Sequence, residues 1–465
     1  MTAYEQFLAA KSQLAHPGGF EPTFLPDYLF PFQRHLVEWA VRQGRGGVFA
    51  DCGLGKTPME LVWAQNVHER TGKPVLLVTP LAVGFQIAQE AVKFHVEAAI
   101  SRTGKVAAPV TITNYEQLEK FNPDDYGGVV CDESSAIKSF DGVRRAIVTE
   151  FLRTVPYRLL GTATAAPNDY IELGTSSEAL GELGAMDMLN RFFTNKNKTS
   201  DIRSKYKSRA AGGKPGQSGS EWRFKGHAPE PFWRWVASWA RALRKPSDYG
   251  FSDEGFNLPP LEYRTHVVEA RTVKEGTLFD VPAVGLHEER EEIRRTIQER
   301  CEQAAKALVD ADSAVAWCHL NDESTLLTKL IGGAVEVTGS DPLEAREEKL
   351  RAFSAGDIRV LVTKPKLGAW GLNWQHCHRM AYFPSHSYEA MYQAVRRSWR
   401  FGQQHPVTVD VITTEGGKGT LANLQRKATQ ADEMFSALVR HMSSAMTVER
   451  RNDFTTPIEV PKWLR

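Results

Sequence analysis

The sequence predicts an α/β protein built from two doubly wound parallel sheets, one in each half of the chain, with a small helical insertion between them. Its apolar runs are short and continuous rather than alternating, which is typical of strands buried on both faces. Each run is followed by a longer segment with helical spacing, as in successive βαβ units. The length of 465 residues is too great for one ordinary core, so two domains are expected.

Ten apolar runs are the predicted strands. In the first half they are GGVFA (46–50), VLLVT (75–79), VTIT (110–113), GVVCD (128–132) and YRLLG (157–161). In the second half they are AVAWC (314–318), AVEVT (334–338), IRVLV (358–362), RMAYF (379–383) and VTVDVI (407–412). The resulting division is a first domain at 1–185, an insertion at 186–260, a second domain at 261–430, and a terminal helix and tail at 431–465.

The insertion interrupts the strand–helix pattern. Residues 195–209 are basic with a single acid, Asp201, and residues 210–220 have the composition of a flexible loop. The aromatic segment that follows has helical spacing, which favours a helix packed in a core over a base-stacking surface. It places Phe232, Trp235, Val236, Trp239 and Leu243 on one stripe.

Composition excludes several classes of protein. The chain is 42% hydrophobic and 24% charged, which is ordinary for a globular protein. No apolar run approaches the roughly 20 residues of a membrane span, and the first residues lack the pattern of a secretory signal. The five cysteines form no CxxC pair, so a reducing, cytoplasmic compartment is expected. We interpret HCH at 376–378 as ordinary core or loop residues, because no second ligand pair is near in sequence.

The segment VFADCGLGKTPM (48–59) predicts a phosphate-binding loop between a strand and a helix. Gly53 and Gly55 let the backbone turn tightly, so that amide N–H groups point at phosphates. Lys56 can reach the β- and γ-phosphates, and the Thr57 hydroxyl can bind Mg²⁺. Ala50 stands where the first glycine of the full GxxxxGKT pattern would be.

A phosphate-binding loop of this kind needs an acidic residue on a neighbouring strand, and GVVCDESSAIKS (128–139) contains one. Asp132 and Glu133 directly follow an apolar strand, at the sheet edge where open α/β folds bind ligands. Asp132 is placed to hold Mg²⁺, and Glu133 to orient and deprotonate the attacking water. Alone, two adjacent carboxylates could be ordinary turn residues, but with Lys56 and Thr57 upstream the metal and catalytic reading is favoured.

Together these segments resemble a superfamily 2 helicase-like motor, most closely its Swi/Snf-type branch in a compact phage or prokaryotic form. LFPFQRHLVEWA (29–40) looks like the Q motif, ADCGLGKT motif I, DESS motif II and LLGTATAAPNDYIELGT (159–175) motif III. KPKLGAWGLNWQ (364–375) resembles motif V and QAVRRSWRFGQ (393–403) motif VI. FNLPPLEYRTHVVE (256–269) looks like the crossing into the second lobe. DESS departs from the usual DEAH or DEAD.

The resemblance implies two RecA-like lobes that bind ATP and Mg²⁺ between them. It assigns adenine recognition to Gln33 and a nucleotide contact to Gly371, and it places Gln393, Arg397 and Arg400 at the catalytic centre. Thr162 and Thr164 would couple nucleotide state to motion. Contacts to a nucleic-acid backbone would be made by Thr79, Thr113, Asn114, Lys364 and Lys366, and the basic run 196–209 is either a further contact or a solvated loop.

These inferences predict an ATP hydrolase that moves along DNA, with double-stranded DNA favoured, as a cytoplasmic monomer. A strand-separating DNA or RNA helicase is the alternative enzyme. An ATP-switched DNA-binding scaffold, or the motor subunit of a larger complex, is the alternative of another class. Within motif VI, we predict one helix from Tyr388 to Trp399. Arg396 falls outside the family pattern and is interpreted as an ion-pair or backbone-contact residue.

Overall fold

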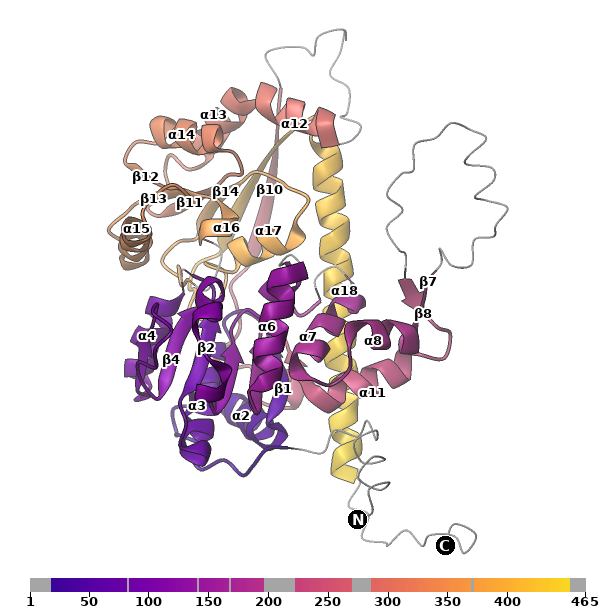
Figure 1. Ribbon diagram of the computed structural model, residues 1–465. Helices are drawn as coiled ribbons and strands as arrows, with labels where there is room; N and C mark the ends of the chain where they lie inside the picture. Colours follow the sequence, from indigo (N-terminus) through magenta and orange to yellow (C-terminus); the bar gives the residue numbers. More distant parts are fainter. Residues whose placement is uncertain are drawn as a thin grey trace, which may run out of the picture.

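The computed structural model describes residues 18–81, 83–139, 142–166, 169–195, 222–269, 286–368 and 372–451. The protein is an α/β structure with two parallel sheets, of seven and six strands, and a small antiparallel ribbon (Figure 1). We call the seven-stranded sheet and the helices packed on it the first lobe, and the six-stranded sheet with its helices the second lobe. The predicted fold class is confirmed at this level.

The first sheet has the order β3-β4-β2-β5-β6-β1-β9. Its strands are β1 (Arg45–Ala50), β2 (Val75–Thr79), β3 (Ala98–Ile100), β4 (Val110–Asn114), β5 (Gly128–Cys131), β6 (Tyr157–Gly161) and β9 (Ala240–Leu243). The second sheet has the order β10-β15-β14-β11-β13-β12. Its strands are β10 (Leu261–Val268), β11 (Ala314–Trp317), β12 (Ala334–Val337), β13 (Val360–Thr363), β14 (Arg379–Tyr382) and β15 (Val407–Thr414). All ten predicted strands are present.

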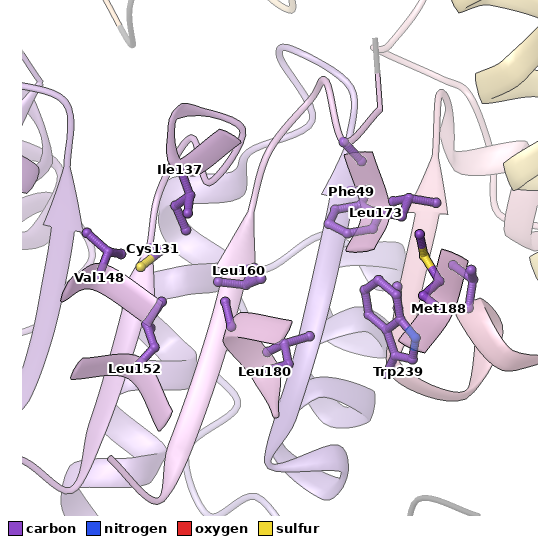
Figure 2. Packing of buried hydrophobic residues seen from close by; sticks show 14 of the residues in the cluster. Phe49, Cys131, Ile137, Val148, Leu152, Leu160, Leu173, Leu180, Met188 and Trp239 are labelled. Carbon is purple, nitrogen blue, oxygen red and sulfur yellow. The ribbon is translucent and has the colours of Figure 1, made fainter. Parts of the chain in front are cut away.

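Helices cover both faces of each sheet, which explains the continuous apolar runs. Along β2, Leu76 and Val78 pack into one core of the first lobe, whereas Val75 and Leu77 pack into another. The helices of the first lobe are α2 (Pro31–Gln43), α3 (Lys56–Thr71), α4 (Gly84–Lys93), α5 (Ala136–Ser139), α6 (Gly142–Thr154), α7 (Leu173–Leu180), α8 (Ala185–Phe192) and α11 (Pro229–Trp239). Figure 2 shows Cys131 and Leu160 of the sheet against Leu152 and Leu180 of the helices.

The second lobe is covered in the same way. Ala314 and Ala316 of β11 face a core formed with α13, whereas Val315 and Trp317 face the opposite core. Its helices are α12 (Leu286–Arg295), α13 (Ile297–Ala307), α14 (Asn321–Leu330), α15 (Leu343–Ala355), α16 (Pro365–Gly368) and α17 (Tyr388–Val395). A final helix, α18 (Lys418–Arg451), follows β15.

The predicted insertion is partly built into the first lobe. Helix α11 carries the aromatic stripe, and Phe232 and Trp239 are fully buried in the core, so the core interpretation is confirmed. The stripe does not continue to Leu243, because residues 240–243 form β9, which pairs in parallel with β1. The rest is the ribbon of β7 (Phe193–Asn195) and β8 (Trp222–Phe224). The basic run 196–209 lies outside the described residues.

Helix α18 contacts both lobes, and it begins well before residue 431, where the terminal helix was predicted. Leu424 packs in a core of the second lobe, whereas Leu438 and Met442 pack in a core of the first. Figure 1 shows α18 running along both lobes. Arg244 also forms an ion pair with Asp432 of this helix. Among the described residues, no helix has both the length and the apolar character that crossing a membrane requires.

Candidate active site

The loop between β1 and α3 has the geometry of an anion-binding turn. Gly53 and Gly55 have φ of 88° and 73°, a backbone region that favours glycine. A Cβ at Gly55 would overlap the Gln33 amide, and one at Gly53 would lie 2.6 Å from the Phe401 amide nitrogen of the second lobe. Helix α3 begins at Lys56 directly after this turn, so its first N–H groups and the positive end of its dipole face the loop.

Lys56 and Gln33 both contact the loop itself. Lys56 Nζ donates a hydrogen bond to the Ala50 carbonyl at 3.1 Å. Gln33 Nε2 donates to the Leu54 carbonyl at 2.9 Å, and its Oε1 accepts from the Phe30 amide at 3.0 Å. The described contacts of Gln33 therefore hold the shape of the loop, and its predicted contact with adenine stays a prediction.

Aromatic rings from both lobes meet beside the loop. Phe30 of the segment resembling the Q motif lies 6.1 Å, between ring centroids, from Phe401 of the segment resembling motif VI. Phe256 stacks on Phe401 at 4.8 Å. Phe30 and Phe401 remain 43% and 37% exposed. A flat ring system bound near the loop would find apolar faces from both lobes here.

The two predicted acidic residues lie at the carboxyl end of β5, and both are buried. Asp132 Oδ2 accepts a hydrogen bond from Thr79 Oγ1 at 3.0 Å. Burial, followed by the negative charge of Glu133, raises the pKa of Asp132 to about 7, and the Lys56 charge opposes this shift. A metal ion binds the deprotonated carboxylate, so a cation bound at Asp132 would displace this proton.

Glu133 has a strained backbone. Its φ of 49° lies in the left-handed region, which costs a side-chain-bearing residue about 1–2 kcal/mol. Its carboxylate accepts a hydrogen bond from Thr162 Oγ1 at 3.4 Å. Strain at a residue of this kind is often found at functional sites, since the surrounding structure must hold the residue in place.

Thr164 joins the two lobes. Its amide donates to Thr162 Oγ1 at 3.0 Å. Its hydroxyl lies 3.3 Å from both Ser135 Oγ and Glu389 Oε1 of the second lobe and can donate to either one. Gln393 Nε2 of the second lobe donates to the same hydroxyl at 3.4 Å. Thr162 and Thr164, which were predicted to couple nucleotide state to motion, therefore connect the DESS segment (132–135) with α17.

The three arginines of the segment that resembles motif VI have different surroundings. Helix α17 ends at Val395 and a turn follows, so the predicted single helix to Trp399 is wrong and the arginines do not share helical spacing. Arg397 is 2% exposed and donates to the Leu372 carbonyl at 3.2 Å and to Gln393 Oε1 at 2.9 Å. Its contacts lie within the second lobe. Arg396 forms an ion pair with Asp51 of the first lobe. This is one of the two roles predicted for it, an ion-pair residue or a backbone-contact residue.

Arg400 is the arginine that lies against the glycine-rich loop. A Cβ at Gly53 would be 3.3 Å from Arg400 Cβ. Arg400 Nη1 donates to the Leu372 carbonyl at 3.2 Å, while its buried Nε has no hydrogen-bond partner among the described residues. Burial, and then the neighbouring charge of Arg397, lowers the pKa of Arg400 to about 10. Arg400 therefore lies next to the loop with at least one guanidinium N–H group, that of Nε, lacking an acceptor among the described residues.

The residues predicted to contact nucleic acid do not lie together. Thr79 is buried with its hydroxyl on Asp132, so it belongs to the acidic site. Thr113 is also buried, and Asn114 accepts from the Gln117 amide at 3.1 Å. Lys364 donates to Asn321 Oδ1 at 2.6 Å on the second lobe, and Lys366 is exposed on α16. Gly371 lies outside the described residues.

Glu60, one turn after Lys56 on α3, lies beside the candidate site and was not predicted from the sequence. Glu60 is 3% exposed, and neither carboxyl oxygen has a hydrogen-bond partner among the described residues. Burial, followed by the negative charge of Asp132, raises its pKa well above the ordinary value, against the opposing charge of Lys56. The sequence did contain a signal for Glu60. It is four positions after Lys56, so both side chains lie on one face of the helix. A carboxyl group placed among apolar helix residues also costs free energy unless it has a function there.

No cluster of three or more His, Cys, Asp or Glu side chains in the described part of the chain could hold a metal ion. Thr57 and Asp132 would supply two oxygen ligands, which suits an ion such as Mg²⁺ that keeps waters and takes phosphate oxygens. A comparison of the chain with protein-family models gave no match, and a search among curated proteins gave none either.

Proposed function

We propose that this chain is an ATP hydrolase with two RecA-like lobes, working as a motor on DNA. One observation carries the proposal: a glycine-rich loop opening α3 shares the carboxyl edge of its sheet with Asp132 and Glu133, while an arginine of the other lobe lies against the same loop. Phosphoryl transfer needs positioning and charge neutralisation more than covalent chemistry. These are the groups that such a reaction requires.

Each residue has a specific part in the proposed reaction. The loop amides and Lys56 would bind the β- and γ-phosphates, and Thr57 and Asp132 would hold Mg²⁺, which neutralises phosphate charge. Glu133, oriented by Thr162, would accept the proton of the attacking water. Arg400 would neutralise charge on the transferred group, an effect worth about 10³–10⁵ in rate in related chemistry. Arg397, with its contacts to Leu372 and Gln393, would hold the turn that carries Arg400.

The DNA-motor part of the proposal rests on the resemblance of the ordered motifs to the Swi/Snf-type branch. Closure of two lobes on ATP and their separation after hydrolysis would move phosphate-binding residues along one track. Lys364 and Lys366 are the accessible basic candidates on the second lobe. Double-stranded DNA is favoured, with a strand-separating helicase as the alternative enzyme. The protein would act as a monomer in the cytoplasm of a prokaryotic or phage-infected cell.

The test is ATP turnover by the full chain with double-stranded, single-stranded and branched DNA, and with RNA, across a range of salt concentrations. We expect stimulation by double-stranded DNA that weakens with salt, because phosphate contacts release counterions. Glu133→Gln should keep ATP binding and lose turnover. The hydrolase proposal fails if the parent protein and Glu133→Gln release phosphate at the same rate. The motor proposal fails if no nucleic acid changes turnover, and this would favour the switched scaffold.

A further inference from the structure

A buried ion pair crosses from the first lobe to the second, directly beside the glycine-rich loop. Asp51 is the last residue before that loop turns, and its side chain accepts from the Arg396 guanidinium and from the Tyr392 hydroxyl. The same carboxylate also accepts from the Cys52 amide at 2.6 Å. One acidic side chain therefore holds the start of the loop and two residues of the opposite lobe.

Arg396 is fixed by its surroundings as well as by its charge. The Arg396 and Asp51 side chains are only 7% and 12% exposed. The guanidinium lies 4.6 Å from the ring centroid of Trp399 and 5.4 Å from that of Tyr392, and it also donates to the Trp399 carbonyl at 3.3 Å. Removing either partner of this pair would leave an uncompensated buried charge, which costs more than breaking a surface pair.

The pair lies at one end of the turn that carries Arg400. Arg396 begins this turn, and Phe401, whose amide comes within van der Waals range of Gly53, ends it. Within the turn, Arg400 N donates to the Ser398 carbonyl and Gln403 N to the Arg400 carbonyl, each at 3.0 Å. Because the turn is internally bonded, fixing Arg396 on Asp51 also fixes where Arg400 lies.

We propose that Asp51, Arg396 and Tyr392 form an interlobe latch that closes the lobes and seats Arg400 on the glycine-rich loop. Arg396 is then a positioning residue, and Arg400 is the residue that meets the phosphate. The assignment of Arg400 rests on the proposed hydrolase function, but the closure of the lobes does not. The latch borders a cavity of about 360 Å³ between the two lobes and α18, so water can reach the separated charges when the lobes part.

The experiment measures lobe closure and turnover in the same variants. Asp51→Asn keeps an oxygen for the Cys52 amide and loses the charge. Arg396→Met keeps an apolar stem between the two rings. The double variant Asp51→Asn/Arg396→Met leaves no unpaired buried charge, so it should fold even if a single variant does not. Arg102→Ala is the matched control, since Arg102 pairs across the lobes with Glu347 at 2.9 Å but is itself 43% exposed.

Closure is read from the distance between two spin labels, one on Val92→Cys of the first lobe and one on Val309→Cys of the second. Both positions are well exposed, whereas the five native cysteines are buried. Cys52 adjoins the latch, so Cys52→Ser is made in every protein compared. In the nucleotide-free protein we expect a longer and broader distance distribution in all three latch variants than in the parent. Arg102→Ala should match the parent.

Turnover should fall by roughly 10²-fold in kcat, as expected when a catalytic group is misplaced by about 1 Å, while KM for ATP changes by less than about twofold. The kcat of the double variant should not be lower than that of the less active single variant. Both single variants break the same contact, so their effects do not add. Unchanged label distances would overturn the latch. Changed distances with parental kcat would overturn its role in seating Arg400. If the parent itself turns over no ATP, the proposed function fails while the distances still decide the latch.

Discussion

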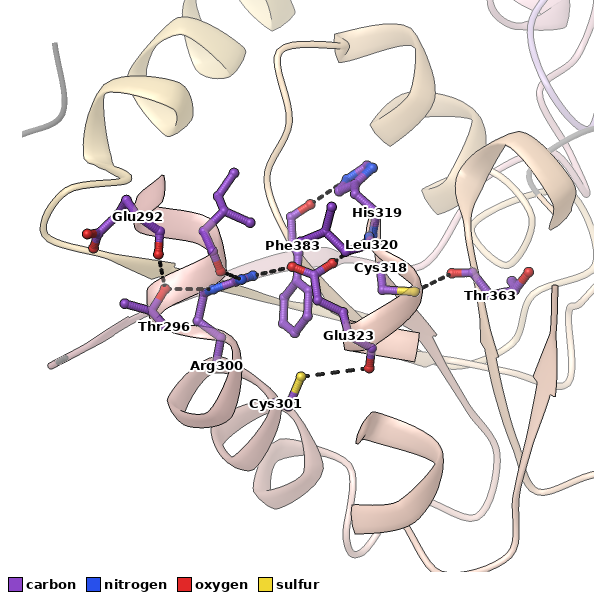
Figure 3. A network of polar contacts seen from close by, with 11 residues as sticks. Glu292, Thr296, Arg300, Cys301, Cys318, His319, Leu320, Glu323, Thr363 and Phe383 are labelled. Carbon is purple, nitrogen blue, oxygen red and sulfur yellow. Dashed lines mark hydrogen bonds and ion pairs between the residues drawn. The ribbon is translucent and has the colours of Figure 1, made fainter. Parts of the chain in front are cut away.

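Two buried glutamates give the sharpest test of the structure, because replacing each by methionine should change stability in opposite directions. Glu60 of α3 and Glu323 of α14 are 3% and 1% exposed. Glu60 has no hydrogen-bond partner among the described residues. Glu323 accepts from Arg300 at 2.8 Å and from the amides of His319 and Leu320, each at 2.9 Å (Figure 3).

The expected magnitudes follow from these contacts. Burial raises the pKa of Glu60 well above its ordinary value and so favours its uncharged form. The cost of a buried polar group without a partner is about 1–3 kcal/mol. Methionine of similar length removes this cost, so Glu60→Met should raise the unfolding free energy by about 1–3 kcal/mol. Glu323→Met leaves Arg300 charged and buried, which should lower the unfolding free energy by about 3–5 kcal/mol.

Equilibrium urea unfolding at pH 7, with a chelator present and followed by circular dichroism, measures both effects. The urea slope is about 1–3 kcal/mol per molar for small proteins and grows with chain length, so at about 3 kcal/mol per molar Glu60→Met should raise the midpoint by roughly 0.3–1 M. A loss of stability in Glu60→Met, comparable to that in Glu323→Met, would refute the reasoning. It would mean that the carboxyl has a partner in solution, such as a water in the cavity of about 10 Å³ that Lys56 and Glu60 line.

Two further predictions concern the candidate active site. Because the pKa of Asp132 rises from 3.8 to about 7 on folding, the empty native protein keeps a proton that the unfolded chain releases. The unfolding free energy should therefore fall between about pH 4 and pH 7, by up to about 4 kcal/mol, and level off above pH 7. Asp132→Asn should show a shallower slope than the parent in urea unfolding with a chelator, the remainder coming from Glu60, whose pKa burial also raises; equal slopes would contradict the assignment. Arg397→Ala should lower the melting temperature, because it leaves the Gln393 side-chain oxygen and the Gln393 carbonyl without the buried donor that Arg397 supplies. Arg400→Ala should instead keep stability and ATP binding, measured by melting and with a fluorescent ATP analogue, and lose about 10³-fold in turnover; the reverse pattern would exchange their roles.

The sequence predicted well wherever the signal is local. Ten strands were found because each is a continuous apolar run buried on both faces. Lys56 at the start of α3 and Asp132 after β5 were placed correctly, since the turn between a strand and a helix and the end of a strand are both visible in neighbouring residues. Strand β10 was not predicted, because residues 262–265 are exposed and carry no apolar run. Strand β9 was read as the end of a helical stripe, although its four residues are all buried.

Tertiary structure decided what depends on contacts between distant residues. No local pattern pairs Arg396 with Asp51, which are 345 positions apart, or brings α18 back onto the first lobe. The sequence pattern separated Arg396 from Arg397 and Arg400 but treated the last two alike, yet Arg397 faces its own core and Arg400 lies against the glycine-rich loop. Sequence alone therefore determined which chemical groups are present and which strand ends carry them. The approach of the two lobes decided which of those groups meet, because that approach depends on packing across the whole chain.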